Sequence, residues 1–379
     1  MDAVEGNIRQ LLNGSSLEEE VLCDFTLADQ NEAIGNNGIL LTPWAGFPQA
    51  TDSMSSGLLC NMQQIKLSKF DRLPVQEHVA KGVAPLAASD YVPILSKTVT
   101  YIVVGVLINS KNEVLMMQEA KKSCAGQWYL PAGRMEPNET IEDAVKREVL
   151  EETGLEMKPT TLLLVESAGG SWFRFIFTGE VVGGSLKTPA QADSESLQAK
   201  WVDNVSELSL RAHDVIDIIE KARMYHRLHK AEPWHDRIRP SLKYHDKLFL
   251  RLVICIKQKA SNRIHVLLSE KTKVHLPVCE IYPARSLHAT LRKFMIEIFG
   301  ADLQLDSHKP HGLLNVEHSV QEGQKHDGLL LTVLVSFRVP LEEVYPIDKY
   351  TWVVVSKEIE EALNLRIPKN MTIPLRVVR

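Results

Sequence analysis

Residues 133–155, GRMEPNETIEDAVKREVLEETGL, decide the fold of the unit that contains them. A loop with Pro and Gly leads into this stretch, and apolar residues recur at helical spacing over 140–153. Asn138 or Thr140 is suited to cap the start of a helix, and Gly154 suits the left-handed position after its end. The pattern predicts a loop followed by an amphipathic helix.

Three glutamates share one face of this helix. Glu148, Glu151 and Glu152 stand at positions i, i+3 and i+4, so their carboxylates converge and repel one another. Arg147 with Glu139 supplies one ion pair, which cannot neutralise three carboxylates. A hard divalent cation can, because carboxylate oxygens are the ligands that Mg²⁺ prefers and Mg²⁺ also binds substrate phosphates. The alternative interpretation is a solvated acidic face, which charge runs usually form.

Strand patterns surround the helix. The β-branched run TVTYIVVGVLI (98–108), a Ser-Lys-Asn turn and the run EVLMMQE (113–119) predict a β-hairpin. Further strands are expected at 161–166, 172–178 and 198–202, and a helix at about 211–228. Together these elements predict an α/β domain over residues 97–230.

The remainder of the chain, residues 245–379, repeats this order of elements. The matching pairs at a constant offset of 146 are Leu130-Pro131 with Leu276-Pro277, Arg147 with Lys293, Glu151 with Glu297 and Gly154 with Gly300. An ungapped offset favours an internal duplication over two unrelated α/β units with common patterning.

The second copy lacks the acidic cluster. Its residues at the positions of Gly133, Glu139, Glu148 and Glu152 are Cys279, Arg285, Phe294 and Ile298. Only Glu297 remains, and one carboxylate cannot hold a metal cluster. We expect residues 245–379 to form a degenerate, non-catalytic domain that serves stability, protein contacts or dimerisation.

The N-terminal part differs in composition from the rest. Residues 33–65 are rich in Asn, Gly, Ser and Gln, and prolines follow them, so 1–96 is expected to be a weakly structured extension. A small packed subdomain is the alternative. Residues 231–244 are expected to be a linker between the two domains.

Composition argues against several classes of protein. The 379 residues carry a net charge of −5, which disfavours a nucleic-acid coat protein or a membrane-surface protein. No stretch is typical of a secretory signal or a membrane span. Five scattered cysteines without a C-x-x-C pair argue against a disulfide framework and a structural zinc site. They indicate a reducing, intracellular compartment, and we expect the cytoplasm.

The segment from Gly133 to Leu155 matches G-x5-E-x7-R-E-U-x-E-E-x-G-U, where U is apolar, at every fixed position. In this motif the chain resembles the Nudix hydrolases. The resemblance implies an α/β/α sandwich around a mixed sheet. It also implies hydrolysis of a nucleoside diphosphate linked to another group, by attack of water on phosphorus with a divalent metal, Mg²⁺ or alternatively Mn²⁺.

The resemblance also implies roles for individual residues. The implied metal ligands are Glu148, Glu151, Glu152 and the backbone carbonyl of Ala132 or Gly133, with Glu195 ahead of Asp193 as a further acid. Arg147 and Glu139 would hold the loop against the helix. Glu152 or Glu151 would act as the base. For the further acid, an ordinary surface carboxylate is the alternative.

The surrounding sequence resembles a branch of the family that hydrolyses 8-oxo-dGDP. Strings such as EVLMMQEAKKSCAGQWYLPAGRMEPNETI, SWFRFIFTG and ADSESLQAKW carry this resemblance over about 100–215. It implies conversion of 8-oxo-dGDP, 8-oxo-GDP or a related oxidised purine diphosphate to the monophosphate and orthophosphate.

Recognition of an oxidised purine needs an apolar or aromatic wall and a few directional hydrogen bonds. The candidate substrate-binding residues are Leu115, Tyr129, Arg134 and Asp214. Each has a structural alternative as a core, rim, ion-pair or helix-start residue. For the whole chain, the alternatives are a Nudix hydrolase of a nucleotide sugar or dinucleotide, and a non-catalytic nucleotide-sensing scaffold. Direct binding of nucleic acid or a membrane is not expected.

Overall fold

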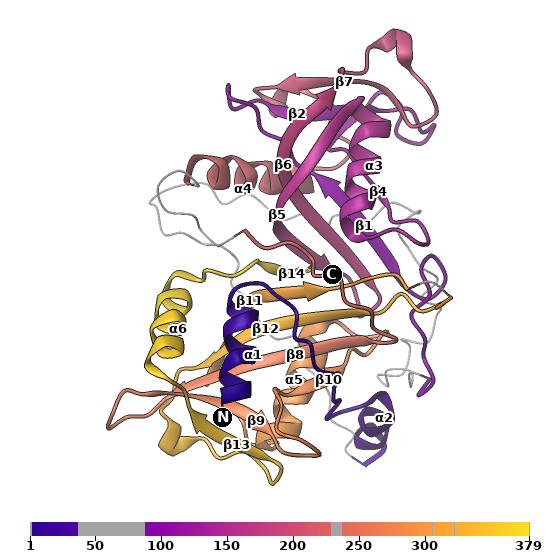
Figure 1. Cartoon of the computed structure of the whole chain (residues 1–379). Helices are drawn as coiled ribbons and strands as arrows, with labels where there is room; N and C mark the ends of the chain where they lie inside the picture. Colours follow the sequence, from indigo (N-terminus) through magenta and orange to yellow (C-terminus); the bar gives the residue numbers. More distant parts are fainter. Residues whose placement is uncertain (1, 37–87, 229–236, 305, 322, 379) are drawn as a thin grey trace.

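The computed structural model describes residues 2–36, 88–228, 237–304, 306–321 and 323–378, which form two stacked α/β units (Figure 1). The first unit has a five-stranded sheet in the order β14-β5-β6-β1-β4 and a three-stranded sheet in the order β3-β2-β7. Their strands are β1 (Thr100–Gly105), β2 (Val114–Glu119), β3 (Trp128–Tyr129), β4 (Ala132–Arg134), β5 (Leu155–Ser167), β6 (Trp172–Gly184), β7 (Ser196–Val202) and β14 (Leu375–Val377). Mixed sheets combined with helices confirm the expected α/β class.

The predicted helix is α3 (Ile141–Thr153), and both of its expected ends are confirmed. The Thr140 hydroxyl accepts a hydrogen bond from the Asp143 backbone N–H at 3.1 Å, which caps the first turn. Gly154 ends the helix with a φ of 75°, a left-handed conformation that favours glycine. The acidic stretch therefore folds locally as its sequence predicts.

The five-stranded sheet lies between two helices. Val103 on β1 packs in the same buried cluster as Val145 and Val149 of α3. Its neighbour Val104 points to the other face and packs in a separate cluster with Ile218 of α4 (Asp214–Leu228). Successive residues of a strand face opposite sides of a sheet, so this alternation builds an α/β/α sandwich.

The predicted hairpin of residues 98–119 is wrong as a pair of adjacent strands in one sheet. Both edges of β1 are already taken, by β4 on one side and β6 on the other. β2 pairs instead with β3 and β7. The two runs meet only near the turn, where the Leu115 N–H donates to the Leu107 carbonyl at 3.0 Å.

The second unit has a six-stranded sheet. Five strands follow the order β11-β12-β8-β9-β13, and β10 pairs with β8. The elements are β8 (Leu248–Lys257), β9 (Ile264–Ser269), β10 (Val278–Glu280), α5 (Leu287–Phe299), β11 (His308–Glu317), β12 (Leu329–Phe337), β13 (Tyr350–Val354) and α6 (Lys357–Lys369). Among the described residues, short 3-10 helices occur in the first unit at η2 (Pro189–Gln191) and η3 (Val205–Glu207) and in the second unit at η4 (Leu341–Glu343).

The two units share one pattern of strand pairing, which supports the internal duplication. β1 runs parallel to β6 and antiparallel to β4, and β8 runs parallel to β12 and antiparallel to β10. β5 and β11 are the antiparallel neighbours of β6 and β12. The helices α3 and α5 begin and end 146 residues apart, the same offset that relates the two sequences.

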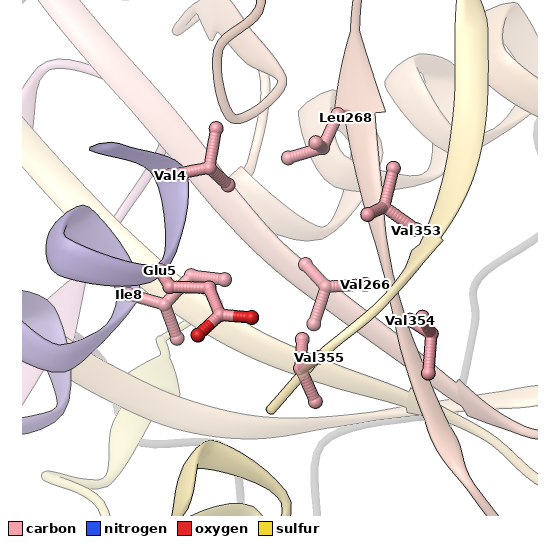
Figure 2. A pocket seen from close by; sticks show the side chains of 8 residues that line it. All are labelled: Val4, Glu5, Ile8, Val266, Leu268, Val353, Val354 and Val355. Atoms are coloured by element: carbon pink, nitrogen blue, oxygen red, sulfur yellow. The ribbon is translucent and has the colours of Figure 1, made fainter. Parts of the chain in front are cut away.

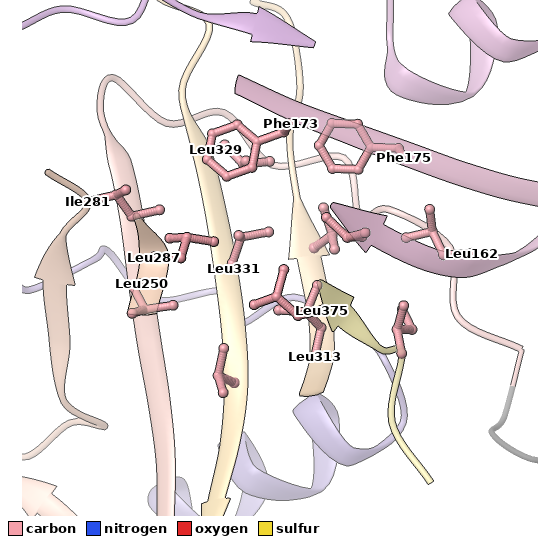
Figure 3. Packing of buried hydrophobic residues seen from close by; sticks show 14 of the residues in the cluster. Leu162, Phe173, Phe175, Leu250, Ile281, Leu287, Leu313, Leu329, Leu331 and Leu375 are labelled. Atoms are coloured by element: carbon pink, nitrogen blue, oxygen red, sulfur yellow. The ribbon is translucent and has the colours of Figure 1, made fainter. Parts of the chain in front are cut away.

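The units share a buried core. Phe173 and Phe175 of β6 belong to one buried cluster with Leu329 and Leu331 of β12, and Figure 3 labels all four. The C-terminal strand β14 extends the sheet of the first unit by pairing with β5.

The structure describes residues 237–244 of the expected linker over 231–244. The Ile238 N–H donates to the Thr161 hydroxyl at 2.9 Å, so this segment packs against the first unit. Residues 229–236 lie outside the described residues.

The N-terminal segment also differs from the expected weakly structured extension. Residues 2–36 form α1 (Asp2–Leu12) and α2 (Leu27–Asn36). Val4 and Ile8 of α1 lie opposite Val266 of β9 and pack in the same apolar cluster of the second unit, as Figure 2 shows. Apolar residues of α1 recur at helical spacing and are buried on one face, which explains why the helix is ordered here. Residues 37–87 of the expected extension lie outside the described residues.

Candidate active site

The carboxylate of Glu148 lies directly against the backbone of β4. A Cβ atom at Gly133 would stand only 2.0 Å from Oε1 of Glu148. Any side chain at this position would displace the carboxylate. The motif therefore needs glycine at position 133 for a steric reason, because the Glu148 carboxylate approaches the backbone of β4 closely there.

Arg147 links the loop, the helix and the acids. Its Nε and Nη2 atoms donate to the two carboxylate oxygens of Glu139 at 2.5 and 3.0 Å. Nη2 also donates to the Arg134 carbonyl at 3.0 Å, which ties β4 to α3. Nη1 reaches Glu148 at 2.9 Å and Glu151 at 3.1 Å. These contacts, with the hydrogen bond to Glu139 the largest, raise the pKa of Arg147.

Two of the three helix acids are buried. Glu148 is 7% exposed and Glu152 is 1% exposed, whereas Glu151 is exposed. Oε2 of Glu152 accepts a hydrogen bond from the Ala132 N–H at 2.8 Å. Burial raises the pKa of Glu148, and it raises that of Glu152 well above its usual range. A bound cation would stabilise the ionised form of both carboxyl groups, because it would compensate their buried charge.

The donor atoms are of the kind that a hard divalent cation binds, but the three carboxylates do not converge as their helical spacing predicts. Across the parts of the chain that the structure describes, no three His, Cys, Asp or Glu side chains are arranged to hold a metal ion. Carboxylate oxygens nevertheless lie buried beside the backbone of β4, with one guanidinium to offset their charge. Oxygen ligands of this kind suit Mg²⁺, which keeps several waters and so needs few protein ligands.

The two candidates for a further acid differ in their contacts. Asp193 forms an ion pair with Lys187 at 2.7 Å, and this hydrogen bond lowers its pKa. Asp193 also accepts from the backbone N–H of Glu195 at 2.9 Å. Glu195 is exposed in the same turn. Lys187 donates to the Glu151 carbonyl at 2.9 Å as well, so this loop is anchored at the end of α3.

A second polar group joins two candidate substrate-binding residues. The Tyr129 hydroxyl and Oδ2 of Asp214 lie 3.3 Å apart. Arg174 donates to both, at 2.9 and 2.8 Å, and is itself paired with the buried Glu166. Oδ1 of Asp214 is buried and has no hydrogen-bond partner within the described residues. It is therefore an available acceptor.

The other two candidates lie elsewhere. Leu115 is fully buried in the core, the position that is its structural alternative. Arg134 is exposed on β4 at the edge of the five-stranded sheet. Sequence analysis missed Arg174, although a charged residue inside the apolar run SWFRFIFTG was a usable signal.

The corresponding place in the second unit is filled with apolar side chains. Cys279, Phe294 and Ile298 are fully buried there. The Phe25 ring stacks on the Phe294 ring with centroids 6.1 Å apart. Backbone hydrogen bonds join Asp24 and Phe25 to β10, at 2.8 and 3.1 Å. The N-terminal segment thus runs along β10, the strand that corresponds to β4.

Comparisons with known proteins agree with this architecture. A family model of the NUDIX domain matches residues 99–222. An 8-oxo-dGDP phosphatase of Danio rerio is 40% identical over 292 residues, which span 75% of this chain and 84% of the relative. The chain belongs to the Nudix hydrolase family. An 8-oxo-dGDP phosphatase of Mus musculus is 38% identical over 294 residues, spanning 74% of this Nudix chain and 88% of the relative.

A solved Nudix hydrolase from Nitrosomonas europaea covers 36% of this chain and 93% of its own, with 28% identity and a TM-score of 0.29. Nudix hydrolases generally need a divalent metal and act on small nucleotide substrates. Within the described residues, no helix of this Nudix chain is both long and apolar enough to span a membrane.

Proposed function

We propose that this chain hydrolyses oxidised purine nucleoside diphosphates, such as 8-oxo-dGDP and 8-oxo-GDP, to the monophosphate and orthophosphate in a Mg²⁺-dependent reaction. The single observation that carries the choice of base is the buried, unpartnered Oδ1 of Asp214 beside Tyr129. Oxidation at C8 turns N7 of guanine from an acceptor into an N–H donor. A buried carboxylate oxygen without a partner suits a substrate with an additional donor. The names of the relatives support the same choice.

In the proposed reaction, water attacks one phosphorus, the bond to the bridging oxygen breaks, and a proton leaves the water. Glu148, Glu151 and Glu152 would hold the cation, together with the backbone carbonyl of Ala132 or Gly133. The bound cation would neutralise phosphate charge and lower the pKa of the attacking water. Either Glu151 or Glu152 would receive the proton.

Other residues would position these groups. Arg147 and Glu139 would keep the loop against α3, as their ion pair supports. Glu195 would add an acid from the loop that Lys187 anchors, and Arg134 would contact a phosphate. Mn²⁺ is the expected substitute for Mg²⁺, since both accept oxygen ligands.

We further propose that residues 245–379 are non-catalytic. The burial of Phe294 and Ile298, where the first unit has glutamates, supports this role. The unit would contribute stability, with protein contacts or dimerisation as additional roles. We propose a cytoplasmic location because the cysteines that the structure describes, Cys23, Cys124, Cys255 and Cys279, are all free thiols.

The test is a substrate panel with the full chain and Mg²⁺, assayed by phosphate release. We expect 8-oxo-dGDP to be cleaved with a higher kcat/KM than dGDP, nucleotide sugars or dinucleotides. Preferential cleavage of a nucleotide sugar or dinucleotide would contradict the choice of substrate. Absence of cleavage of every diphosphate would contradict catalysis and favour a nucleotide-sensing scaffold.

A further inference from the structure

Glu119 is a buried acid that neither the sequence motif nor the proposed ligand set includes. It is the last residue of β2 and is 1% exposed. Oε1 accepts a hydrogen bond from Nη1 of Arg211 at 2.6 Å. Oε2 is buried and has no hydrogen-bond partner within the parts of the chain that are described. A buried carboxylate oxygen left in this state is costly unless a ligand or water satisfies it.

Strand pairing brings Glu119 to the end of the acidic helix. Glu119 is the cross-strand partner of Ser196 on β7. The Ser196 hydroxyl donates to the backbone carbonyl of Glu152 at 2.7 Å. Glu119 therefore lies one strand spacing from a residue that contacts Glu152. Burial and the charge of Glu148 are the larger causes of the raised pKa of Glu152, and the negative charge of Glu119 raises this pKa further.

One guanidinium is shared between this acid and the aromatic side chain beside Asp214. The Arg211 guanidinium carbon lies 5.0 Å from the centre of the Tyr129 ring. The Arg211 N–H also donates to the Trp128 carbonyl at 2.9 Å. Arg211 is thus held in place by contacts other than Glu119. If Glu119 served only to hold Arg211, one oxygen would suffice, and the second would still lack a partner.

We propose that Glu119 is a positioning residue of the metal centre, whose Oε2 accepts a hydrogen bond from a water bound to the divalent cation held by Glu148 and Glu152. This inference rests on the proposed function. Mg²⁺ keeps several of its waters when it binds to proteins, so acceptors for those waters are part of its site. Loss of such an outer partner typically weakens metal affinity or activity by about 10- to 100-fold. Glu119 would act through the water and would not touch the reacting phosphorus.

The experiment measures Mn²⁺ binding to the full chain by electron paramagnetic resonance, without substrate. We expect Glu119→Gln to weaken Mn²⁺ affinity by about 10- to 100-fold. It should raise the Mg²⁺ concentration for half-maximal phosphate release by a similar factor, while KM at saturating Mg²⁺ stays unchanged. Arg211→Met should leave Mn²⁺ affinity within about twofold of wild type, because it retains Glu119. Glu113→Gln is the matched control, since it makes the same change just before the same strand.

Three results separate this inference from the proposed function. Unchanged Mn²⁺ affinity in a folded Glu119→Gln protein overturns the inference, while wild-type hydrolysis still supports the function. A loss in Arg211→Met equal to that in Glu119→Gln also overturns it, because Glu119 would then act only by holding Arg211. Failure of the wild-type chain to bind Mn²⁺ overturns both proposals. If Glu119→Gln does not fold, Glu119→Asp takes its place, since a shortened side chain moves the acceptor away from the water.

Discussion

Replacement of Phe25 by alanine should destabilise the whole chain strongly. Phe25 is 3% exposed, although it lies in a segment that composition predicts to be weakly structured. It stacks on Phe294, and its carbonyl accepts from the Glu280 N–H at 3.1 Å. An aromatic side chain buries about 150–250 Å². At roughly 25 cal/mol per Å², this burial contributes about 4–6 kcal/mol.

Measured Phe→Ala substitutions in cores cost about 3–5 kcal/mol, so we expect Phe25→Ala to lower the free energy of unfolding by about that amount. The assay is urea unfolding followed by tryptophan fluorescence. A shift of the midpoint with an unchanged slope would report lost stability rather than a changed unfolded state. The magnitude is large because whole domains are stable by only about 5–15 kcal/mol.

Tyr345→Ala is the matched control. Tyr345 is an exposed aromatic residue, and exposed substitutions usually change stability by no more than about 0.5 kcal/mol. If Phe25→Ala costs no more than Tyr345→Ala, then the N-terminal segment does not stabilise the second unit. The reasoning from burial would then be refuted.

Three further predictions concern the first unit. Gly133→Ala should reduce kcat, because its Cβ would stand 2.0 Å from the Glu148 carboxylate and displace it. Gly6→Ala in α1, where a Cβ meets nothing within 4 Å, is the control. An unchanged kcat in Gly133→Ala would contradict the steric argument. Glu152→Gln should lower the rate of phosphate release by about 10²-fold or more with the fold intact by circular dichroism, and an unchanged rate would exclude its catalytic role. Asp214→Asn should reduce the kcat/KM preference for 8-oxo-dGDP over dGDP by roughly 10- to 150-fold, because a hydrogen bond to a charged group contributes about that much. Asp217→Asn on the same helix is the control and should retain the preference. If both variants retain it, Asp214 does not take part in base recognition.

Local patterns predict the acidic helix well. Glu148, Glu151 and Glu152 share a face through helical spacing alone, and Thr140 and Gly154 end the helix through their own conformational preferences. None of these features depends on distant parts of the chain, which is why sequence alone predicts them.

Contacts across the sheet are harder to predict. Arg174 reaches Tyr129 across 45 positions of sequence, and Arg211 reaches Glu119 across 92. Strand register brings these residues together, and register follows from the whole pairing pattern. The hairpin expectation failed for the same reason, because β1 had other partners on both edges. A charged residue within an apolar strand was the available signal for Arg174.

The two units differ in the residues that surround the position of the buried Glu148 carboxylate. In the first unit, Gly133 leaves room for the Glu148 carboxylate, whose buried charge is offset by Arg147. In the second, Cys279 and Phe294 fill the same positions, and Phe25 covers them. Replacing buried charges by packed apolar groups is often neutral or stabilising. With apolar residues in place of the acids, β10 pairs with the N-terminal segment, and Leu375 of β14 belongs to the buried core that the two units share.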